Sequence, residues 1–94
     1  MNIQYNTISG RAYKGRNQAD LQNAKAKAGY KSDEWLTFLQ ARGLNLKVIK
    51  GSKSVAIFRG FSKVETKTRN GQLKVNSVPL GFAYVFNIEQ TEKI

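Results

Sequence analysis

Apolar residues recur at helical spacing near the start of the chain. Leu21, Ala24 and Ala28 fall on one side of a helix with about 3.6 residues per turn. Asn17 stands where an N-cap residue is expected, and Gly29 stands where a left-handed residue would end the helix. The pattern therefore predicts a helix over residues 18–28, whose narrow alanine face packs closely against the rest of the fold.

A second helix is predicted over residues 33–42. Ser32 is a suitable N-cap, the first turn is acidic, and Gly43 follows as a terminator. Thr37 and Gln40 lie together on one flank, where we expect them to face solvent. The opposite arc of the helix is apolar and consists of Trp35, Leu36, Phe38 and Leu39.

From Leu46 onward the pattern changes to the two-residue alternation of β-strands. It predicts strands over residues 46–50, 54–61 and 82–88, and the second of these is apolar on both faces, as in a central strand. Asn70 and Gly71 indicate a hairpin, because both tolerate the positive φ that a type I′ turn requires. The predicted fold class is α+β, with two N-terminal helices packed on a small, mostly antiparallel sheet that has a long Asn-Gly hairpin.

The length of the chain limits it to one domain, here taken as residues 1–94. Two domains would each be near the floor of about 40 residues for folding without disulfides or metals. Cys and His are both absent, which excludes disulfides, zinc fingers, thiolate nucleophiles and imidazole bases. We therefore expect no catalytic activity, no metal and no cofactor.

The charge balance points to a polyanionic partner. Lys and Arg number 16 against 6 Asp and Glu, a formal net charge of +10. Nucleic acid is the expected partner, because basic side chains displace its condensed counterions. A membrane surface is the alternative partner, but the sequence shows neither a basic amphipathic helix nor a lipid anchor that would bind it. No apolar run suits a membrane span or a signal peptide. A cytoplasmic location is expected, and solubility alone is the competing explanation of the charge.

The predicted hairpin would carry a cationic face. With Asn70 and Gly71 as the two loop residues, Lys67 would face Lys74 directly across the strands. Alternation would then place four basic residues on one face beside Glu65: Lys63, Lys67, Arg69 and Lys74. This face could hold a phosphate chain, or it could be a solvated surface whose charges keep the strands from pairing with other chains.

Two further basic groups are candidates for binding. A loop before the first predicted helix interleaves cations with an aromatic ring, as phosphate-binding and base-stacking sites do; it contains Arg11, Tyr13, Lys14, Arg16 and Asn17. Alternatively, Tyr13 simply anchors this loop to the core. The other group brackets the turn at Gly51 and is also typical of a solvated edge; it contains Lys47, Lys50, Lys53 and Arg59.

An aromatic stripe follows the last predicted strand. Phe82, Tyr84 and Phe86 alternate along it and so share one face. Such a face could form a platform on which bases stack, but packing into the core is the favoured interpretation.

Four segments of the chain resemble, in order and spacing, the N-terminal domain of the ArdC antirestriction proteins. They are Ser9–Asn17, Trp35–Ala41, Val48–Gly51 and Tyr84–Thr91. The resemblance implies a single-stranded DNA-binding module of conjugative plasmids and phages, which is usually joined to a zinc metalloprotease-like domain. Such a metalloprotease site needs two His on one helix, so the resemblance does not extend to proteolysis here.

Carried over to this chain, the resemblance implies binding roles for a set of matching residues: Arg11, Tyr13, Lys14, Asn17, Trp35, Thr37, Gln40, Lys50, Asn87 and Gln90. There are departures from the family pattern. Ala12 stands where the family usually has Pro, and Arg16 stands where it usually has an apolar residue. These departures concern the shape of the binding groove rather than the class of ligand.

Together these patterns predict a non-enzymatic domain that binds single-stranded DNA with little sequence preference, from a plasmid, phage or other mobile element, with an antirestriction role. The predicted binding residues are Arg11, Tyr13, Lys14, Arg16, Asn17, Thr37, Gln40, Lys47, Lys50, Lys53, Arg59, Lys67, Arg69 and Lys74. The alternative is a protein interaction module whose basic face binds an acidic partner protein. RNA is a further candidate ligand, whereas no membrane or small-molecule substrate is expected, and the oligomeric state is left open.

Overall fold

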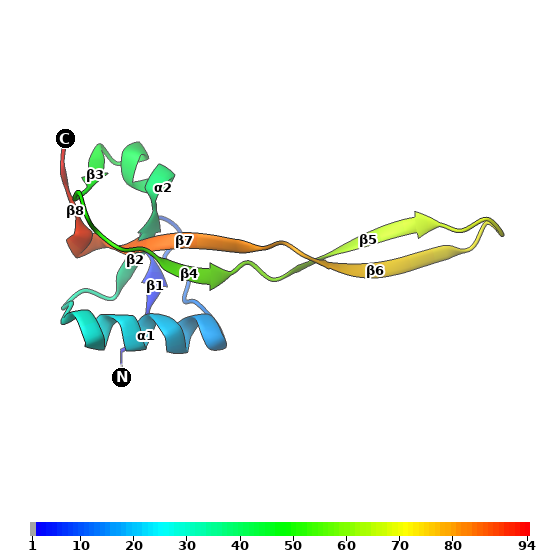
Figure 1. Ribbon diagram of the computed structural model, residues 1–94, viewed down its shortest axis with the longest axis horizontal. Helices are drawn as coiled ribbons and strands as arrows, with labels where there is room; N and C mark the ends of the chain where they lie inside the picture. Colours follow the sequence, from blue (N-terminus) through cyan, green and yellow to red (C-terminus); the bar gives the residue numbers. More distant parts are fainter. Residues whose placement is uncertain (1) are drawn as a thin grey trace.

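The computed structural model describes residues 2–94 (Figure 1). It consists of a compact body from which one long hairpin projects. The elements in chain order are β1 (Tyr5–Asn6), α1 (Arg16–Ala28), β2 (Glu34–Thr37), α2 (Phe38–Gly43), β3 (Leu46–Val48), β4 (Val55–Phe58), β5 (Phe61–Lys67), β6 (Leu73–Pro79), β7 (Phe82–Asn87), the 3-10 turn η1 (Ile88–Gln90) and β8 (Thr91–Lys93).

A four-stranded sheet forms the centre of the body. Its strand order is β1-β2-β7-β4, with β1 parallel to β2 and the other pairs antiparallel. Helix α1 lies against one side of this sheet, whereas α2 and the paired strands β3 and β8 lie on the other side (Figure 1). The core between α1 and the sheet consists of Leu21, Trp35, Ile57 and Val85.

The predicted arrangement of two N-terminal helices packed on a small sheet is wrong. Strands account for 40% of the residues and helical segments for 24%, and the sheet curls into half a barrel. Within residues 2–94, α1 is the one helix longer than two turns, since α2 spans six residues. The molecule is therefore organised around its sheet, and α1 closes one face of it.

Helix α1 starts two residues earlier than predicted. Its N-cap is Gly15, and Asn17 lies inside the first turn. The Asn17 side chain instead bonds to the edge of the sheet, where its Nδ2 donates to the Phe58 carbonyl at 2.8 Å and its Oδ1 accepts from the Phe58 N–H at 2.9 Å. The predicted end is confirmed, because Gly29 adopts the left-handed conformation and its N–H bonds to the Lys25 carbonyl.

The predicted helix over residues 33–42 is also wrong, and the chain forms strand β2 followed by α2. Trp35 and Leu36 are both fully buried, although neighbouring residues on a strand point to opposite faces. Both faces of β2 are covered, and its edges pair with β1 and β7. Every residue of β2 is paired with at least one neighbouring strand, and this pairing outweighs the local helix signal of Ser32 and the acidic residues after it.

Strand β4 ends sooner than predicted and lies at the edge of the sheet rather than at its centre. It pairs with β7 alone, and Ala56 is exposed. The β5–β6 pair keeps the register of the β4–β7 pair. This register runs from Val55 opposite Val85 to Lys67 opposite Leu73. Backbone bonds from Arg59 N to the Gly81 carbonyl (2.9 Å) and from Leu80 N to the Gly60 carbonyl (2.8 Å) bridge the junction. β4–β7 and β5–β6 thus form one long ribbon.

The hairpin forms around Asn70 and Gly71, but its loop has three residues instead of two. Thr68 N bonds to the Gln72 carbonyl at 2.8 Å, and Gly71 N bonds to the Thr68 carbonyl at 2.9 Å. Of the three loop residues, Arg69, Asn70 and Gly71, only Gly71 has positive φ, at 75°, which is the conformation that closes a three-residue loop. The extra loop residue shifts the register by one, so that Lys67 faces Leu73 and Lys74 faces Thr66. The predicted opposition of Lys67 and Lys74, and with it the single cationic face, is wrong.

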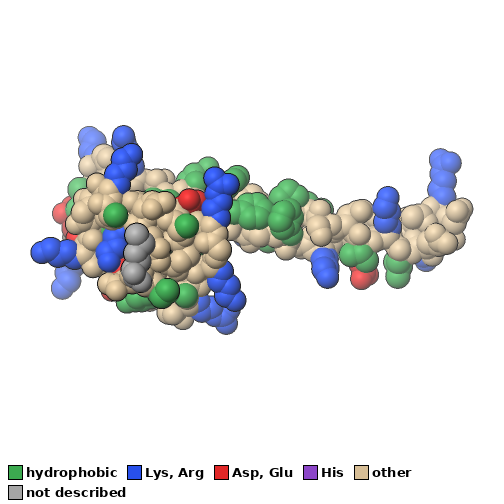
Figure 2. Space-filling model, turned by 90° about the horizontal axis from the view of Figure 1, so that it is seen from below, with side chains coloured by type: hydrophobic (Ala, Val, Ile, Leu, Met, Phe, Trp, Pro, Cys, Tyr) green, Lys and Arg blue, Asp and Glu red, His purple; other side chains and the backbone are tan. Residues whose placement is uncertain are grey.

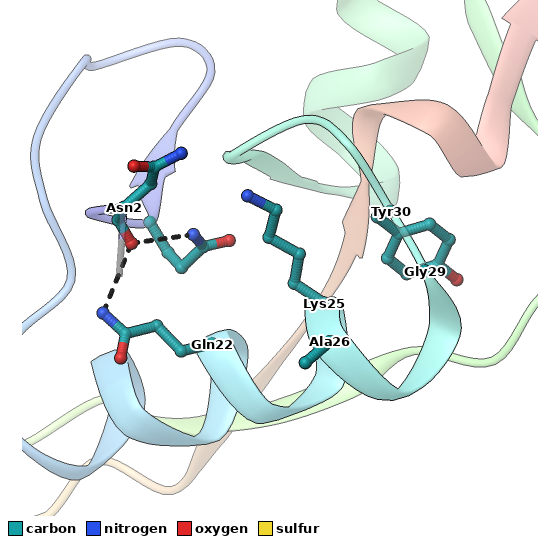
Figure 3. A pocket seen from close by; sticks show the side chains of 7 residues that line it. Asn2, Gln22, Lys25, Ala26, Gly29 and Tyr30 are labelled. Atoms are coloured by element: carbon teal, nitrogen blue, oxygen red, sulfur yellow. Dashed lines mark hydrogen bonds between the residues drawn. The ribbon is translucent and has the colours of Figure 1, made fainter.

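A buried polar network joins the N-terminal segment to the core. Gln4 is 1% exposed, its Oε1 accepts from Trp35 Nε1 at 2.7 Å, and its Nε2 donates to Asp33 Oδ1 at 2.7 Å. Lys25 Nζ donates to the same carboxylate oxygen at 2.6 Å. The network borders a pocket of about 390 Å³, in which Gln4 and Gln22 both donate to the main-chain carbonyl of Asn2 (Figure 3).

This network makes the stability of the protein depend on pH. The hydrogen bond from Lys25 lowers the pKa of the Asp33 carboxyl below its ordinary value. Because the folded-state pKa is lowered, the contribution of Asp33 is fully present above the unfolded pKa of about 3.9 and is lost as pH falls through the lowered pKa. We expect the urea midpoint to fall more steeply from about pH 5 to 2 in the wild type than in Asp33→Asn. The exposed Glu65→Gln should keep the wild-type slope, and parallel curves for Asp33→Asn and the wild type would refute this role of Asp33.

Candidate nucleic-acid interface

The surface where α1 packs against the edge strand β4 is hollowed at both ends, and we refer to it as the α1–β4 seam. The two elements run in opposite directions, since the start of α1 bonds to Phe58 at the end of β4. One hollow, of about 460 Å³, lies at this end and is lined by Lys14, Arg16, Asn17, Asp20, Ala56, Phe58 and Phe82. The other, of about 760 Å³, lies at the C-terminal end of α1, where its wall includes Lys27, Tyr30, Lys50 and Lys53.

The first hollow combines free cations with aromatic rings. Lys14, on the loop that leads into α1, and Arg16, the first residue of α1, are both exposed. Arg16 Nε lies 3.8 Å from Asp20 Oδ2, but the Arg16 side chain is 92% exposed, so this ion pair is weak and the guanidinium is free to meet another anion. Opposite them, Phe58 and Phe82 face each other across β4 and β7. The hollow therefore offers charge on one side and ring surface on the other.

Four aromatic side chains gather where the body meets the hairpin, and we refer to them as the aromatic cluster: Phe58, Phe61, Phe82 and Tyr84. The Phe58 ring lies 5.1 Å from the Phe61 ring and 5.7 Å from the Phe82 ring, each in an edge-on arrangement. Phe61, Phe82 and Tyr84 are 64%, 60% and 59% exposed. Exposed rings held together in this way are typical of a binding surface.

The favoured interpretation of the aromatic stripe on β7, that it packs into the core, is wrong for Phe82 and Tyr84. The residues of β7 that face α1 are Ala83, Val85 and Asn87, of which Val85 and Asn87 are buried. Phe86 is half-buried, opposite the buried Leu36. On the face of the sheet opposite α1, α2 covers only the end of β7 near Phe86. The rings of Phe82 and Tyr84 on the same face therefore remain in solvent.

Several predicted binding residues have their side chains engaged within the fold. Tyr13 packs against the core, and its hydroxyl accepts from Asn6 Nδ2 at 3.1 Å. Burial raises the pKa of this hydroxyl. Thr37 and Gln40 form a capping box at the start of α2, in which Thr37 Oγ1 accepts from Gln40 N and Gln40 Oε1 accepts from Thr37 N. A binding role for Tyr13, Thr37, Gln40 or Asn17 stays a prediction. It would require that each side chain contact the ligand while keeping its hydrogen bonds within the fold.

Other residues implied by the resemblance also have structural roles. Asn87 and Gln90 form a second capping box at η1, and Gln90 Nε2 donates to the Lys53 carbonyl at 2.9 Å. Trp35 lies fully buried in the core. Lys47, which was predicted from the basic group around the turn at Gly51, lies across β3 and β8 from Glu92, with its Nζ at 3.4 Å from the carboxylate. Among the predicted cations, Lys14, Arg16, Lys50 and Lys53 line the seam, while the hairpin cations lie apart from it.

The seam also contains residues that the sequence did not single out. Lys27 lines the second hollow beside Lys50 and Lys53. Phe58 joins the first hollow because the register places it opposite Phe82. The place of Lys27 one residue before the end of the predicted helix was the only sequence signal for its position, and nothing in the sequence indicated the pairing of Phe58.

Within residues 2–94, His, Cys, Asp and Glu form no group of three or more that could hold a metal ion. The same part of the chain contains no helix long and apolar enough to cross a membrane. A family model for the N-terminal domain of the anti-restriction factor ArdC matches residues 1–87. The chain belongs to this family.

Solved structures of an ArdC protein share the fold. The metal-free crystal structure of the antirestriction ArdC protein from plasmid R388 has a TM-score of 0.79 at 30% identity, and the match covers 98% of this chain and 33% of that chain. For the Mn(II)-bound structure, the TM-score is 0.67 at 25% identity, with 98% and 35% covered. The chain thus spans about a third of the length of these proteins. A comparison with curated proteins finds no match.

Membership of the ArdC N-terminal domain family confirms the resemblance drawn from the four sequence segments. Those segments include the loop before α1, the first residues of α1 and the part of β7 from Tyr84 onward, which supply Lys14, Arg16 and Tyr84 to the surfaces described above. The match extends over the hairpin residues as well as the body, because it covers nearly the whole chain.

Proposed function

We propose that this ArdC-type domain binds single-stranded DNA with little sequence preference along the α1–β4 seam. The observation that carries the proposal is the first hollow, where Lys14 and Arg16 face Phe58 and Phe82. Lys and Arg would contact the phosphates, and bases would stack on the exposed rings of Phe82 and Tyr84. Lys27, Lys50 and Lys53 would take the next phosphates at the other end of the seam.

The proposed ligand is a single strand because exposed rings can stack only on bases that are not already stacked in a duplex. Every base has a flat face, so stacking on aromatic side chains tolerates any sequence. Hydrogen-bonding side chains that could read base edges, such as those of Asn17 and Asn87, are engaged with backbone groups of the fold. This supports affinity without sequence selection.

The biological setting is proposed from the relatives. The matching structures are of an antirestriction protein from plasmid R388. We propose that this domain serves an antirestriction function in the cytoplasm on behalf of a mobile element, and that its part is to bind DNA rather than to catalyse a reaction.

The salt dependence of binding tests this proposal directly. About five phosphates neutralised at roughly 0.7 counterions each predict a slope near −3 to −4 for log K against log salt concentration. The measurement is fluorescence anisotropy of labelled oligo-dT, titrated with protein at several salt concentrations. No detectable complex at about 50 mM salt, the low end of the range in which such contacts are strong, would rule out the proposal.

A further inference from the structure

We propose that the hairpin arm, residues 61–79, is a second nucleic-acid contact that lies in the major groove of duplex DNA next to the single strand. The inference rests on the proposed function, because the seam is assigned to the single strand. Together, the two surfaces would make the domain a reader of junctions between single-stranded and double-stranded DNA.

The arm has little to stabilise it within the molecule. Every residue of β6 is exposed, and β5 is exposed apart from the half-buried Ser62. The arm projects well clear of the body (Figure 1) and gives the molecule a longest extent of 56 Å against 30 and 23 Å. A two-stranded hairpin with no third strand or helix against it is marginally stable in water. An arm of this kind is better explained by a surface that it contacts than by a role in folding.

The charge of the arm selects an anionic partner. It carries Lys63, Lys67, Arg69 and Lys74 against the single acid Glu65. Within residues 2–94, the ion pairs are Arg16–Asp20, Lys25–Asp33 and Lys47–Glu92, and none of them involves the arm. These charges are therefore free to release counterions from a phosphate backbone.

The register shows that these cations point in different directions. Lys63 and Lys67 lie on the face that also carries Leu73, whereas Lys74 lies on the opposite face with Thr66. Figure 2 shows Lys and Arg side chains projecting from both sides of the arm. A flat anionic surface would reach only one face of the ribbon. Two phosphate backbones that flank a groove would reach both faces.

The dimensions of a two-stranded ribbon fit the major groove of B-form DNA. Its strands are about 4.8 Å apart, and the groove is about 12 Å wide, which admits a β-ribbon with its side chains. The major groove of A-form RNA is too narrow for this. The continuous β4–β5 and β6–β7 ribbon joins the arm directly to the aromatic cluster.

The experiment compares the affinity for a single strand with the affinity for the same strand joined to a duplex. One probe is labelled oligo-dT of about 15 nucleotides, near the upper site size of single-strand binding folds. The other carries the same oligo-dT next to a DNA duplex of about 12 base pairs, slightly more than one helical turn. We expect the wild type to bind the DNA junction about tenfold more tightly or better, a gain of about 1.4 kcal/mol.

Neutral variants assign that gain to the arm. In Lys63→Gln/Lys67→Gln/Lys74→Gln the ratio of the two dissociation constants should fall to near one. The matched control Lys31→Gln/Arg42→Gln/Lys93→Gln removes exposed cations of the body that lie outside the arm and outside both hollows of the seam, and it should keep the wild-type ratio. Circular dichroism spectra and melting curves of each variant establish that it is folded.

Three results would overturn the proposal. They are equal affinity of the wild type for both probes, an equal gain from an RNA duplex placed beside the same oligo-dT, and a junction preference that survives in the arm variant. Sedimentation of the protein alone provides one more, since a dimer that disappears in the arm variant would assign the arm to protein contact. Failure of the wild type to bind oligo-dT would count against the proposed function of the seam. Binding of the same duplex without its single strand, measured as a third probe, separates that outcome from the role of the arm, because the arm variant should bind this duplex more weakly than the wild type does.

Discussion

Replacing both Phe82 and Tyr84 with alanine is expected to weaken oligo-dT binding by at least about thirtyfold. Stacking of a base on an aromatic side chain contributes about 1–3 kcal/mol, and each 1.4 kcal/mol is a tenfold change in affinity. The two rings are 60% and 59% exposed, so their removal takes little from the core. Fluorescence anisotropy measures the affinity, and the melting temperature should change little.

The matched control is Phe38→Ala. Phe38 is also exposed, at 49%, and lies on α2 with the Arg42 guanidinium 5.9 Å from its ring centre. It is outside both hollows of the α1–β4 seam. We therefore expect this variant to bind oligo-dT as the wild type does.

A second probe separates stacking from charge. Inorganic polyphosphate has the charge of a nucleic-acid backbone but carries no bases. Phe82→Ala/Tyr84→Ala should bind it as tightly as the wild type, because Lys14, Arg16 and the other cations are intact. An unchanged affinity for oligo-dT, or an equal loss for both probes, would show that the aromatic cluster does not stack on bases.

The sequence predicted those features that depend on local signals. The end of α1 at Gly29 and the strand β7 were both located correctly, because a left-handed glycine and two-residue alternation act within a few residues. The family resemblance was also recognised, since its four segments are short and colinear. Several cations of the seam lay within these segments.

The errors share one physical cause, which is that pairing between distant segments decides the outcome. Ser32 and the acids after it favour a helix, but the backbone between β1 and β7 is satisfied only as strand β2. The two-residue turn expected at Asn70 and Gly71 became a three-residue loop, and Lys74 consequently moved to the other face of the arm. The aromatic stripe on β7 was predicted to pack into the core because aromatic rings favour burial. In the structure, the opposite face of β7, which carries Val85, packs under α1 instead. Which face of a β-strand is buried depends on the segments that pack against it, and the sequence of that strand alone does not reveal this.

The largest expected change in stability is for Gln4→Leu, at about 2–5 kcal/mol of the free energy of unfolding. Leucine fills much of the same space but cannot accept the Trp35 Nε1–H or donate to Asp33. Each buried polar group left without a partner costs about 1–3 kcal/mol. A domain of this size has only about 5–14 kcal/mol in total, so the loss would be easily seen in urea unfolding.

The contribution of the indole contact can be isolated with a double-mutant cycle. Trp35→Phe removes the Nε1–H that Gln4 accepts, so that Leu at position 4 no longer leaves this donor unpaired. The double variant should therefore be destabilised by at least about 0.5 kcal/mol less than the sum of the two single variants. Gln72→Leu is the matched control, because Gln72 is exposed in the hairpin and should change stability by less than about 0.5 kcal/mol.

The same network determines how the binding surface is positioned. The Gln4 backbone N–H donates to Gln18 Oε1 at 2.7 Å, and Gln18 Nε2 donates to the Gln4 and Tyr13 carbonyls at 3.0 and 2.8 Å. The loop that presents Lys14, together with the start of α1 that presents Arg16, is thus tied through Gln18 to the segment that holds Gln4. Gln4→Leu should weaken oligo-dT binding only at temperatures where the variant begins to unfold. A wild-type melting temperature for Gln4→Leu, or strict additivity in the cycle, would show that this buried amide does not hold the core together.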